Sequence, residues 1–455
     1  MSISRLAGGV PLLGHALEFQ RNPVALLRRG RALHGELFCF RLPGKTVHVL
    51  TEPDGNEVFF RAPDDQLSAR EAYQFTVPMF GKGVAYDAPP ELMDEQLGFL
   101  IPALRDARMQ TYAQAMEEET ESYCDTLGDE GELELTRVMN ELTVFNACRC
   151  LIGRDFRRRL SGEFAESYRD LEAGVNLVAF FRPGWPLPAM RRRDRGRAHI
   201  VRMISGVLEE RRRRPGDDDF VDTLVAARYR DGRSLSDHEI IGLLLTVIFA
   251  GQHTSAVMAA WTGILMLQHP RYLDRVRIEQ SRLERDRPLT LAALRSLVML
   301  ERCIKEAERM YPPLVMLMRA ILRDVPYRGE TLPAGDLAMV APAVTHRLPH
   351  IFREPDRYDP DRFGPGREED RRKQFALIGF GGGKHRCIGA GFAYQQIKVI
   401  WTVLLRRFQM ELASGDHAPD YSTFVVGPRQ PCVVRYRRKC ARALVAAGQK
   451  ETHSL

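Results

Sequence analysis

The ten residues from 380 to 389, FGGGKHRCIG, place one cysteine, Cys387, among four glycines and three basic side chains. An apolar segment with helical spacing follows directly. The N-terminal end of a helix carries partial positive charge, which favours a thiolate over a thiol. Glycines leave space and free backbone N–H groups near a sulfur atom. The loop therefore indicates either a buried turn residue or a thiolate offered to a large, flat ligand.

A long apolar segment before Pro270 predicts one unusual helix. Ser236, followed three residues later by Glu239, forms a capping box at its start. Roughly 30 residues at 1.5 Å each make a rod of about 45 Å. Because scarcely any charge interrupts it, we expect this helix to run through the core.

The sequence AGQHTS, residues 250 to 255, interrupts this apolar helix with polar groups. Gly251 removes side-chain bulk, while His253 and Thr254 bring a titratable ring and a hydroxyl into an apolar place. Buried polar groups cost free energy unless they are paired. The insert fits equally well a locally loosened helix with satisfied polar groups and a flat ligand lying against Ala250 and Gly251.

Two further patterns carry charge. Glu306 and Arg309 lie three residues apart, on one helical face that Pro312 and Pro313 end. The sequence YDPDRF, residues 358 to 363, predicts a turn that presents Arg362. A single ion pair at this spacing is usually a weak surface contact.

Composition indicates an ordinary globular protein, with 455 residues, 44% hydrophobic and 27% charged. No linker, repeat or low-complexity tract divides it, so we expect a single domain over residues 1–455. The net charge of +7 lies partly in arginine clusters, but no nucleic-acid-binding motif accompanies them. We therefore expect no nucleic-acid partner, while an acidic protein partner remains open.

The eight cysteines show no CxxC pair and no zinc-like spacing, so most are expected to be small buried residues in a reducing compartment. The sequence lacks the apolar run of a signal peptide or transmembrane anchor. These observations predict a soluble, cytoplasmic protein.

The periodicity predicts a mainly α fold with minor β structure. We expect a β-rich N-terminal part over about residues 30–85, including a hairpin around Pro43 and Gly44, and a helical core over about 90–320. A short β-rich stretch is expected near 320–345. The cysteine loop and the helix after it are expected over about 378–410.

Taken in order, AGQHTS, Glu306-x-x-Arg309, Pro360-Asp361-Arg362-Phe363 and the cysteine loop resemble the motifs of the cytochrome P450 superfamily. The resemblance implies a haem-thiolate monooxygenase, with a single-domain fold whose long central helix crosses the haem. Cys387 would be the axial ligand of the haem iron, and a thiolate ligand favours O–O cleavage. Phe380 and Gly381 would lie beside that ligand. Glu306, Arg309 and Arg362 would form a buried network that holds the loop.

Four longer stretches are similar to sterol 14α-demethylases of the soluble bacterial type and extend the resemblance over nearly the whole chain: AYQFTVPMFGKGVAYD (72–87), RPGWPLPAMRRRDR (182–195), FAGQHTS (249–255) and MLMRA (316–320). This family implies oxidative removal of the 14α-methyl group of a lanosterol-like sterol, in three successive oxidations that release formate. His253 and Thr254 would deliver protons during oxygen activation. Glu172 would pass protons to His253 from the surface.

The same resemblance implies the remaining site residues. Those expected to bind the haem propionates are Tyr73, Tyr86, Arg319 and His385. Those expected to line the sterol pocket are Phe75, Thr76, Val77, Phe80, Val175, Ala250 and Met316. The sequence departs from the family at Leu97-Gly98, where the family has two lysines, at Val175, where an aromatic is usual, and at Glu172, where Asp is usual.

Two alternatives stay open at this stage. The enzyme could oxidise another polycyclic terpenoid or lipid, which the pocket departures favour and the matching GKGVAYD and AGQHTS segments oppose. A haem protein that senses or stores without turnover is disfavoured, because a sensor needs no proton-delivery pair at His253 and Thr254.

Electrons are expected from outside, because the chain has no dinucleotide-binding fingerprint and no iron–sulfur cysteine run. A separate ferredoxin with its reductase is the expected donor. It would dock at Lys384, Arg386 and the cluster from Arg371 to Lys373, and the substrate would be taken up at the membrane surface.

Overall fold

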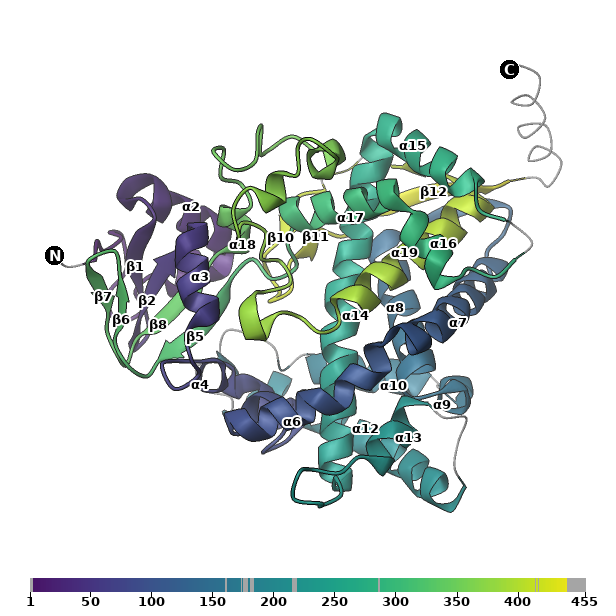
Figure 1. Ribbon diagram of the computed structural model, residues 1–455, viewed down its shortest axis with the longest axis horizontal. Helices are drawn as coiled ribbons and strands as arrows, with labels where there is room; N and C mark the ends of the chain where they lie inside the picture. The colour runs from purple at the N-terminus through teal and green to yellow at the C-terminus, as the bar shows by residue number, and fades with distance from the viewer. Residues whose placement is uncertain are drawn as a thin grey trace.

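The computed structural model describes residues 3–439 except 160–161, 173, 175–178, 181–183, 215–218, 285–286, 414 and 416. The strands of the largest sheet gather at the N-terminal side of the molecule, whereas the long helices occupy the other side (Figure 1). The prediction of a mainly α fold with minor β structure is confirmed. The helices are α1 (Ala16–Arg21), α2 (Pro23–His34), α3 (Pro53–Arg61), α4 (Ala69–Ala72), α5 (Val77–Phe80), α6 (Pro90–Leu100), α7 (Asp106–Asp125), α8 (Leu135–Leu151), α9 (Arg154–Arg159), α10 (Gly162–Glu172), α12 (Pro188–Arg213), α13 (Phe220–Ala226), α14 (Asp237–Gln268), α15 (Pro270–Ser281), α16 (Leu291–Ser296), α17 (Val298–Met310), α18 (Pro342–Thr345) and α19 (Ala390–Arg407).

The main sheet has five strands in the order β1-β2-β8-β5-β3. They are β1 (Leu37–Leu42), β2 (Lys45–Leu50), β8 (Leu337–Val340), β5 (Leu317–Ile321) and β3 (Leu67–Ser68). The predicted hairpin is β1–β2, and its turn needs Gly44 because the backbone there has a φ of 71°. The β-rich stretch expected near 320–345 supplies β5 and β8, which return from late in the chain to pair beside β2.

Smaller sheets complete the fold. One joins β4 (Glu130–Glu134), β12 (Val433–Arg438) and β9 (Phe408–Leu412) in the order β4-β12-β9. Two pairs are β6 (Val325–Tyr327) with β7 (Glu330–Leu332), and β10 (Pro419–Asp420) with β11 (Gly427–Pro428). All these pairings are antiparallel.

Helix α14 is the long core helix that the sequence predicts. Both halves of its capping box form, between the Ser236 and Glu239 side chains and backbone N–H groups. Among the described residues, α14 is the one helix long and apolar enough to cross a membrane, but 67% of its most apolar segment is buried inside the protein. Its composition is therefore that of a helix at the centre of the core, where it packs against α8, α17 and α19 (Figure 1).

Close packing at Gly263 sets the position of α19 against α14. A Cβ atom built at Gly263 would lie 1.9 Å from the Trp401 ring, so only a glycine allows the ring to lie there. The Trp401 Nε1–H also donates to the carbonyl of Ala259 at 2.9 Å. Because α19 begins at Ala390, directly after the cysteine loop, this contact helps to position Cys387 relative to α14.

Candidate active site

Cys387 lies in the loop before α19, as predicted, with its sulfur at the N-terminal end of that helix. The backbone N–H groups of Gly389 and Ala390 donate to the sulfur. The residue is exposed on one side, whereas the six other described cysteines are buried. Protein on its other side raises the pKa of the Cys387 thiol, and the two N–H donors and Arg386 oppose that rise. The loop therefore offers an accessible sulfur with thiolate-stabilising donors already in place.

The glycines of this loop are needed for close approach. Gly381 has a φ of 70°, and a Cβ there would lie 2.8 Å from the carbonyl oxygen of His385. Gly383 has a φ of 56°, and a Cβ there would lie 2.7 Å from the carbonyl oxygen of Phe60. A side chain at Gly383 would push the loop away from α3, and one at Gly381 would clash within the loop. The glycines thus fold the chain tightly enough for the Cys387 N–H to donate to the Phe380 carbonyl at 2.8 Å.

Glu306, Arg309 and Arg362 form one buried network, each with no exposed side-chain surface. Nε of Arg309 donates to Glu306 Oε2 at 2.7 Å, and Nε of Arg362 donates to Glu306 Oε1 at 3.0 Å. Arg362 also donates to Glu369 Oε2 at 2.6 Å. Two arginines are therefore matched by two carboxylates, which makes burial of these charges tolerable.

His346 connects this network to the cysteine loop, and sequence reasoning missed it. Arg309 Nη1 donates to the His346 carbonyl at 2.8 Å, while the His346 Nε2 accepts the N–H of Ile378 at 2.9 Å. Burial and the neighbouring Arg309 lower the pKa of His346 to about 3, so the ring is neutral and can accept. The network thus holds the chain two residues before Phe380. No local pattern around His346 signals this contact, because its partners are distant in sequence.

The middle of α14 opens toward the site, although the rest of the helix is buried. Ala250 is exposed, and a Cβ atom built at Gly251 would meet no protein atom within 4 Å. The Thr254 Oγ1 donates to the Ala250 carbonyl at 2.6 Å. This geometry favours a flat ligand against Ala250 and Gly251 over a merely loosened helix, because the helix stays continuous here.

His253 and Glu172 come together across two helices. The His253 Nδ1 lies 2.9 Å from Glu172 Oε1, and both side chains are about one-quarter exposed. Glu172 is the last residue of α10, and His253 lies in the middle of α14. A partly exposed carboxylate that is hydrogen-bonded to an imidazole can pass protons between solvent and the interior.

Comparisons with known proteins decide the family. The cytochrome P450 family model matches residues 5–434. The chain belongs to the cytochrome P450 family. It is 38% identical to the sterol 14-demethylase of Arabidopsis thaliana, over 94% of this chain and 90% of that protein. It is 37% identical to the sterol 14alpha-demethylase of Mycobacterium tuberculosis, over 96% and 99%, and 36% identical to the lanosterol 14-alpha demethylase of Macaca fascicularis, over 94% and 85%.

A solved structure shows the same fold. The retinoic acid-bound cyanobacterial CYP120A1 superposes with a TM-score of 0.87 at 23% identity, covering 96% of this chain and all of that one. Membership of the cytochrome P450 family and the sterol 14-demethylase relatives make this P450 a haem-thiolate monooxygenase, which uses O2 and electrons from a donor.

The residues fit a haem between the Cys387 loop and α14. Cys387 presents a thiol with N–H donors behind it, and Ala250 and Gly251 leave space for a planar group. Six of the other cysteines are buried, and the eighth, Cys440, lies outside the described residues. Cys387 thus meets the requirements of a haem ligand on its own structural grounds.

The predicted propionate-binding residues gather beside this loop. The Tyr73 and Tyr86 rings lie 5.3 Å apart, and electrostatic interactions join Tyr86 to Cys387 and Arg319. Arg319 is 3% exposed and lies over the Phe59 ring at 4.8 Å, and burial lowers its pKa. Such a buried guanidinium suits a carboxylate partner. Among the described residues Arg319 forms no ion pair with a carboxylate, and its Nη1 donates to the Leu67 carbonyl at 3.5 Å.

His385 has a protein partner that the sequence did not suggest. Its Nε2 lies 2.8 Å from Asp64 Oδ1, and the other Asp64 oxygen accepts from Lys384 at 2.7 Å. Burial and the neighbouring Arg319 lower the pKa of His385, and Asp64 opposes this. A role of His385 toward a propionate would use its other ring nitrogen.

The predicted pocket residues are apolar except Thr76, and most of those that the structure describes are buried. Phe75 is 4% exposed and lies between the Phe180 and Phe424 rings, at 5.9 Å and 5.7 Å. Phe80 lies 5.5 Å from Phe249. Thr76 and Met316 are buried, Val77 is half-buried, and Val175 lies outside the described residues. Sequence reasoning missed Phe180 and Phe424, which meet Phe75 only through tertiary packing.

The departure at Leu97-Gly98 lies on α6. Leu97 is half-buried and packs on the main core, whereas Gly98 is exposed and a Cβ there would meet nothing within 4 Å. Leu97 and Gly98 therefore fit their surroundings without the two lysines that are usual in the family.

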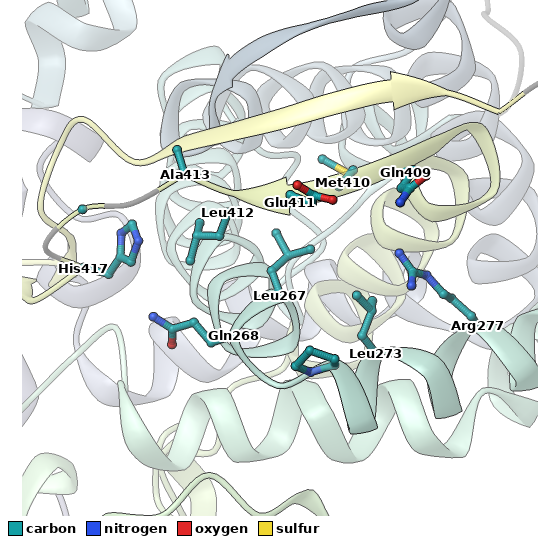
Figure 2. Close-up of a pocket in the computed structure, with 12 residues that line it drawn as sticks. Leu267, Gln268, Leu273, Arg277, Gln409, Met410, Glu411, Leu412, Ala413 and His417 are labelled. Carbon is teal, nitrogen blue, oxygen red and sulfur yellow. The ribbon is translucent and has the colours of Figure 1, made fainter.

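A separate groove lies at the far end of α14. Figure 2 shows Leu267 and Gln268 on one side and β9 with Glu411 and Leu412 on the other. It lies about 25 Å along α14 from Ala250, at 1.5 Å per residue. The groove is therefore distinct from the haem site.

Proposed function

We propose that this P450 removes the 14α-methyl group of a lanosterol-like sterol by successive oxidations of that carbon. The observation that carries the substrate class is that plant, mycobacterial and primate relatives bearing this activity in their names are 36–38% identical over nearly the whole chain. The aromatic residues around Phe75 and Phe80 support it, because fused apolar rings require an apolar, shape-matched pocket.

The mechanism assigns Cys387 as the haem ligand, with Phe380 and Gly381 beside it. When bound, the thiolate-ligated haem supplies the activation of O2. Tyr73, Tyr86, Arg319 and His385 would hold the propionates by hydrogen bonds and charge. Ala250 would lie against the haem face, where its small side chain leaves room for O2 and the substrate methyl.

Protons would travel from solvent to Glu172, then to His253, and reach the reacting centre near Thr254. The carboxylate accepts a proton at the surface and the imidazole passes one on, since the two groups are already hydrogen-bonded. The Thr254 hydroxyl donates to Ala250 in this structure and would re-orient to donate into the site. Because the Glu172 and His253 side chains are each about one-quarter exposed, this pair would exchange protons with water. The rest of α14, which is buried, would keep bulk solvent out of the site.

Electrons would come from a separate ferredoxin and its reductase. The exposed Arg386, Arg371 and Arg372 would attract an acidic donor to the face near the cysteine loop. Lys384 and Lys373 contribute less than expected, because Asp64 and Asp54 each pair with one of them at 2.7 Å.

The protein would be soluble and would meet the membrane surface transiently to collect its substrate. Leu12 supports this, because it is 96% exposed in the Val10–Gly14 turn at a φ of 63°, a conformation that costs free energy for a leucine. Leu13 and Leu17 are exposed nearby. Co-sedimentation with phosphatidylserine vesicles should weaken in Leu12→Ser, and equal binding of both proteins would contradict this contact.

The experiment that tests the proposed function is an optical titration of the haem-loaded protein with lanosterol and related 14α-methyl sterols. We expect the Soret band to shift as the haem iron would change from low-spin to high-spin when a sterol occupies the pocket. A normal haem-thiolate spectrum that no sterol changes would leave a monooxygenase of another polycyclic terpenoid or lipid, the second candidate. For any substrate that shifts the Soret band, analysis of the products formed with a ferredoxin and its reductase would count the oxidation steps.

A further inference from the structure

A buried carboxylate lies beneath the cysteine loop and has no part in the roles above. Glu308 stands between Glu306 and Arg309 on α17 and is 3% exposed. Its side chain takes no part in the network of Arg309 and Arg362, and instead accepts a hydrogen bond from the Tyr394 hydroxyl at 2.8 Å. No ion pair joins it to a cation among the described residues. Burying an acidic group without a cation costs free energy, and such groups are found mostly at functional sites.

The Glu308 carboxylate touches the backbone that carries the loop. A Cβ atom built at Gly379 would lie 2.5 Å from Glu308 Oε1 and 2.7 Å from its Cγ, so the acid fills the space that this glycine leaves. Gly379 precedes Phe380, whose carbonyl accepts the Cys387 N–H at 2.8 Å. The Phe380 ring lies 5.6 Å from the Tyr394 ring. Glu308 and Tyr394 therefore pack behind the residues that support the sulfur.

Few charges surround Glu308. Lys305 lies one turn earlier on α17 and pairs with Asp370, Arg386 comes from the cysteine loop, and Tyr394 comes from α19. Burial raises the pKa of Glu308 to about 7, while the Tyr394 hydroxyl, Lys305 and Arg386 oppose that rise and Asp370 adds to it. The charge of Glu308 acts on Cys387 in turn. Glu301 acts on Tyr394 from farther along α17.

We propose that Glu308, held by Tyr394, sets the electron affinity of the haem from beneath the cysteine loop. Reduction brings one electron from the external donor onto the haem and its thiolate. An ionised carboxylate behind the loop opposes that added negative charge through a low-dielectric medium, whereas a neutral carboxyl group does not. Where Glu308 is ionised, uptake of one proton from solvent by this group offsets the added electron. The proposal rests on Cys387 as the haem ligand.

Spectroelectrochemical titration of haem-loaded protein tests this, with the midpoint potential measured between about pH 5.5 and pH 8.5, on either side of the Glu308 pKa of about 7. The wild-type potential should fall as pH rises. Glu308→Gln should have a higher potential than wild type at the alkaline end and match it at the acid end. Glu354→Gln removes one exposed charge, paired with Arg357, away from Glu308 and should keep the wild-type profile.

Tyr394→Phe supplies a second variant. It removes the donor that favours the ionised carboxylate, so the pH at which the potential changes should move upward. Wild-type potentials in Glu308→Gln at both ends of the range, or an equal offset at every pH, would overturn the inference. A wild-type protein without a haem-thiolate spectrum would overturn the role of Cys387 as well, which distinguishes the two failures.

Discussion

The Nδ1 of His253 lies 2.9 Å from Oε1 of Glu172, joining the middle of α14 to the end of α10. The pair links a group beside the haem site to a partly exposed carboxylate. It supports the proposed proton route, in which Glu takes the place of the Asp usual in the family.

Replacing Glu172 with Gln should slow product formation about tenfold or more, because Gln keeps the hydrogen bond but cannot carry a proton, and general acid–base groups contribute roughly 100-fold or more. The rate should be measured at saturating electron donor. Asp170→Asn, on the same helix and paired with Arg192, is the matched control and should keep the wild-type rate.

Thr254→Ala should keep haem but divert electrons to hydrogen peroxide. Unchanged product yield per electron pair in both site variants would contradict the route.

The buried arginine network should be essential for stability. Glu306→Gln would leave Arg309 and Arg362 without their shared carboxylate, and breaking a buried pair costs about 3–5 kcal/mol. Urea unfolding of the haem-loaded protein should show this loss, together with weaker haem retention because the loop depends on His346. Glu354→Gln, which breaks an exposed pair with Arg357, should change the free energy of unfolding by less than about 1 kcal/mol. Similar losses in the two variants would contradict the role of the network.

Two helical glycines should respond in opposite directions to alanine. Gly98 on α6 is exposed with open space around it, so Gly98→Ala should stabilise the protein by about 0.5–1 kcal/mol. Gly263→Ala should destabilise it by about 1–3 kcal/mol, because the methyl would meet the Trp401 ring at 1.9 Å. Thermal unfolding of both variants measures the difference. A stabilising Gly263→Ala would show that α14 and α19 can separate at little cost.

The pH dependence of stability should carry the signature of Glu308. Its pKa rises from 4.5 to about 7 on folding, so the folded state binds more protons between these values. Its contribution is therefore most favourable below about pH 4.5 and is lost as pH rises toward 7. His346, whose pKa falls from 6.5 to about 3, acts in the opposite direction. Comparing wild type with Glu308→Gln isolates the contribution of Glu308. The variant should gain stability relative to wild type as pH rises. A difference in the free energy of urea unfolding that stays constant from about pH 5 to pH 8 would refute this prediction.

Electron transfer from an acidic ferredoxin should slow as ionic strength rises, because salt shortens the reach of surface charges to about 10 Å at 0.1 M. Stopped-flow reduction would measure the rate. Arg386→Gln should lower the low-salt rate more than Lys384→Gln does, since Asp64 already offsets the lysine charge. A salt-independent rate would remove the electrostatic part of the docking proposal.

The sequence alone determined the features that depend on local chemistry. The capping box of Ser236, the hairpin at Gly44 and the helix after the cysteine loop all formed as predicted. Capping, turn geometry and apolar periodicity act between residues a few positions apart, so their signals are readable in order along the chain. The motif around Cys387 likewise indicated the family, which the comparisons confirm.

Only the tertiary structure decided which groups are buried and which charges meet. Asp64 pairs with Lys384 and His385 from more than 300 positions away, and His346 reaches Ile378 through a buried contact. No sequence pattern marks Glu308 as buried, yet it lies in the core against Gly379. Protonation and ion pairing depend on desolvation and on distances of a few ångströms, and these arise only when remote segments pack together.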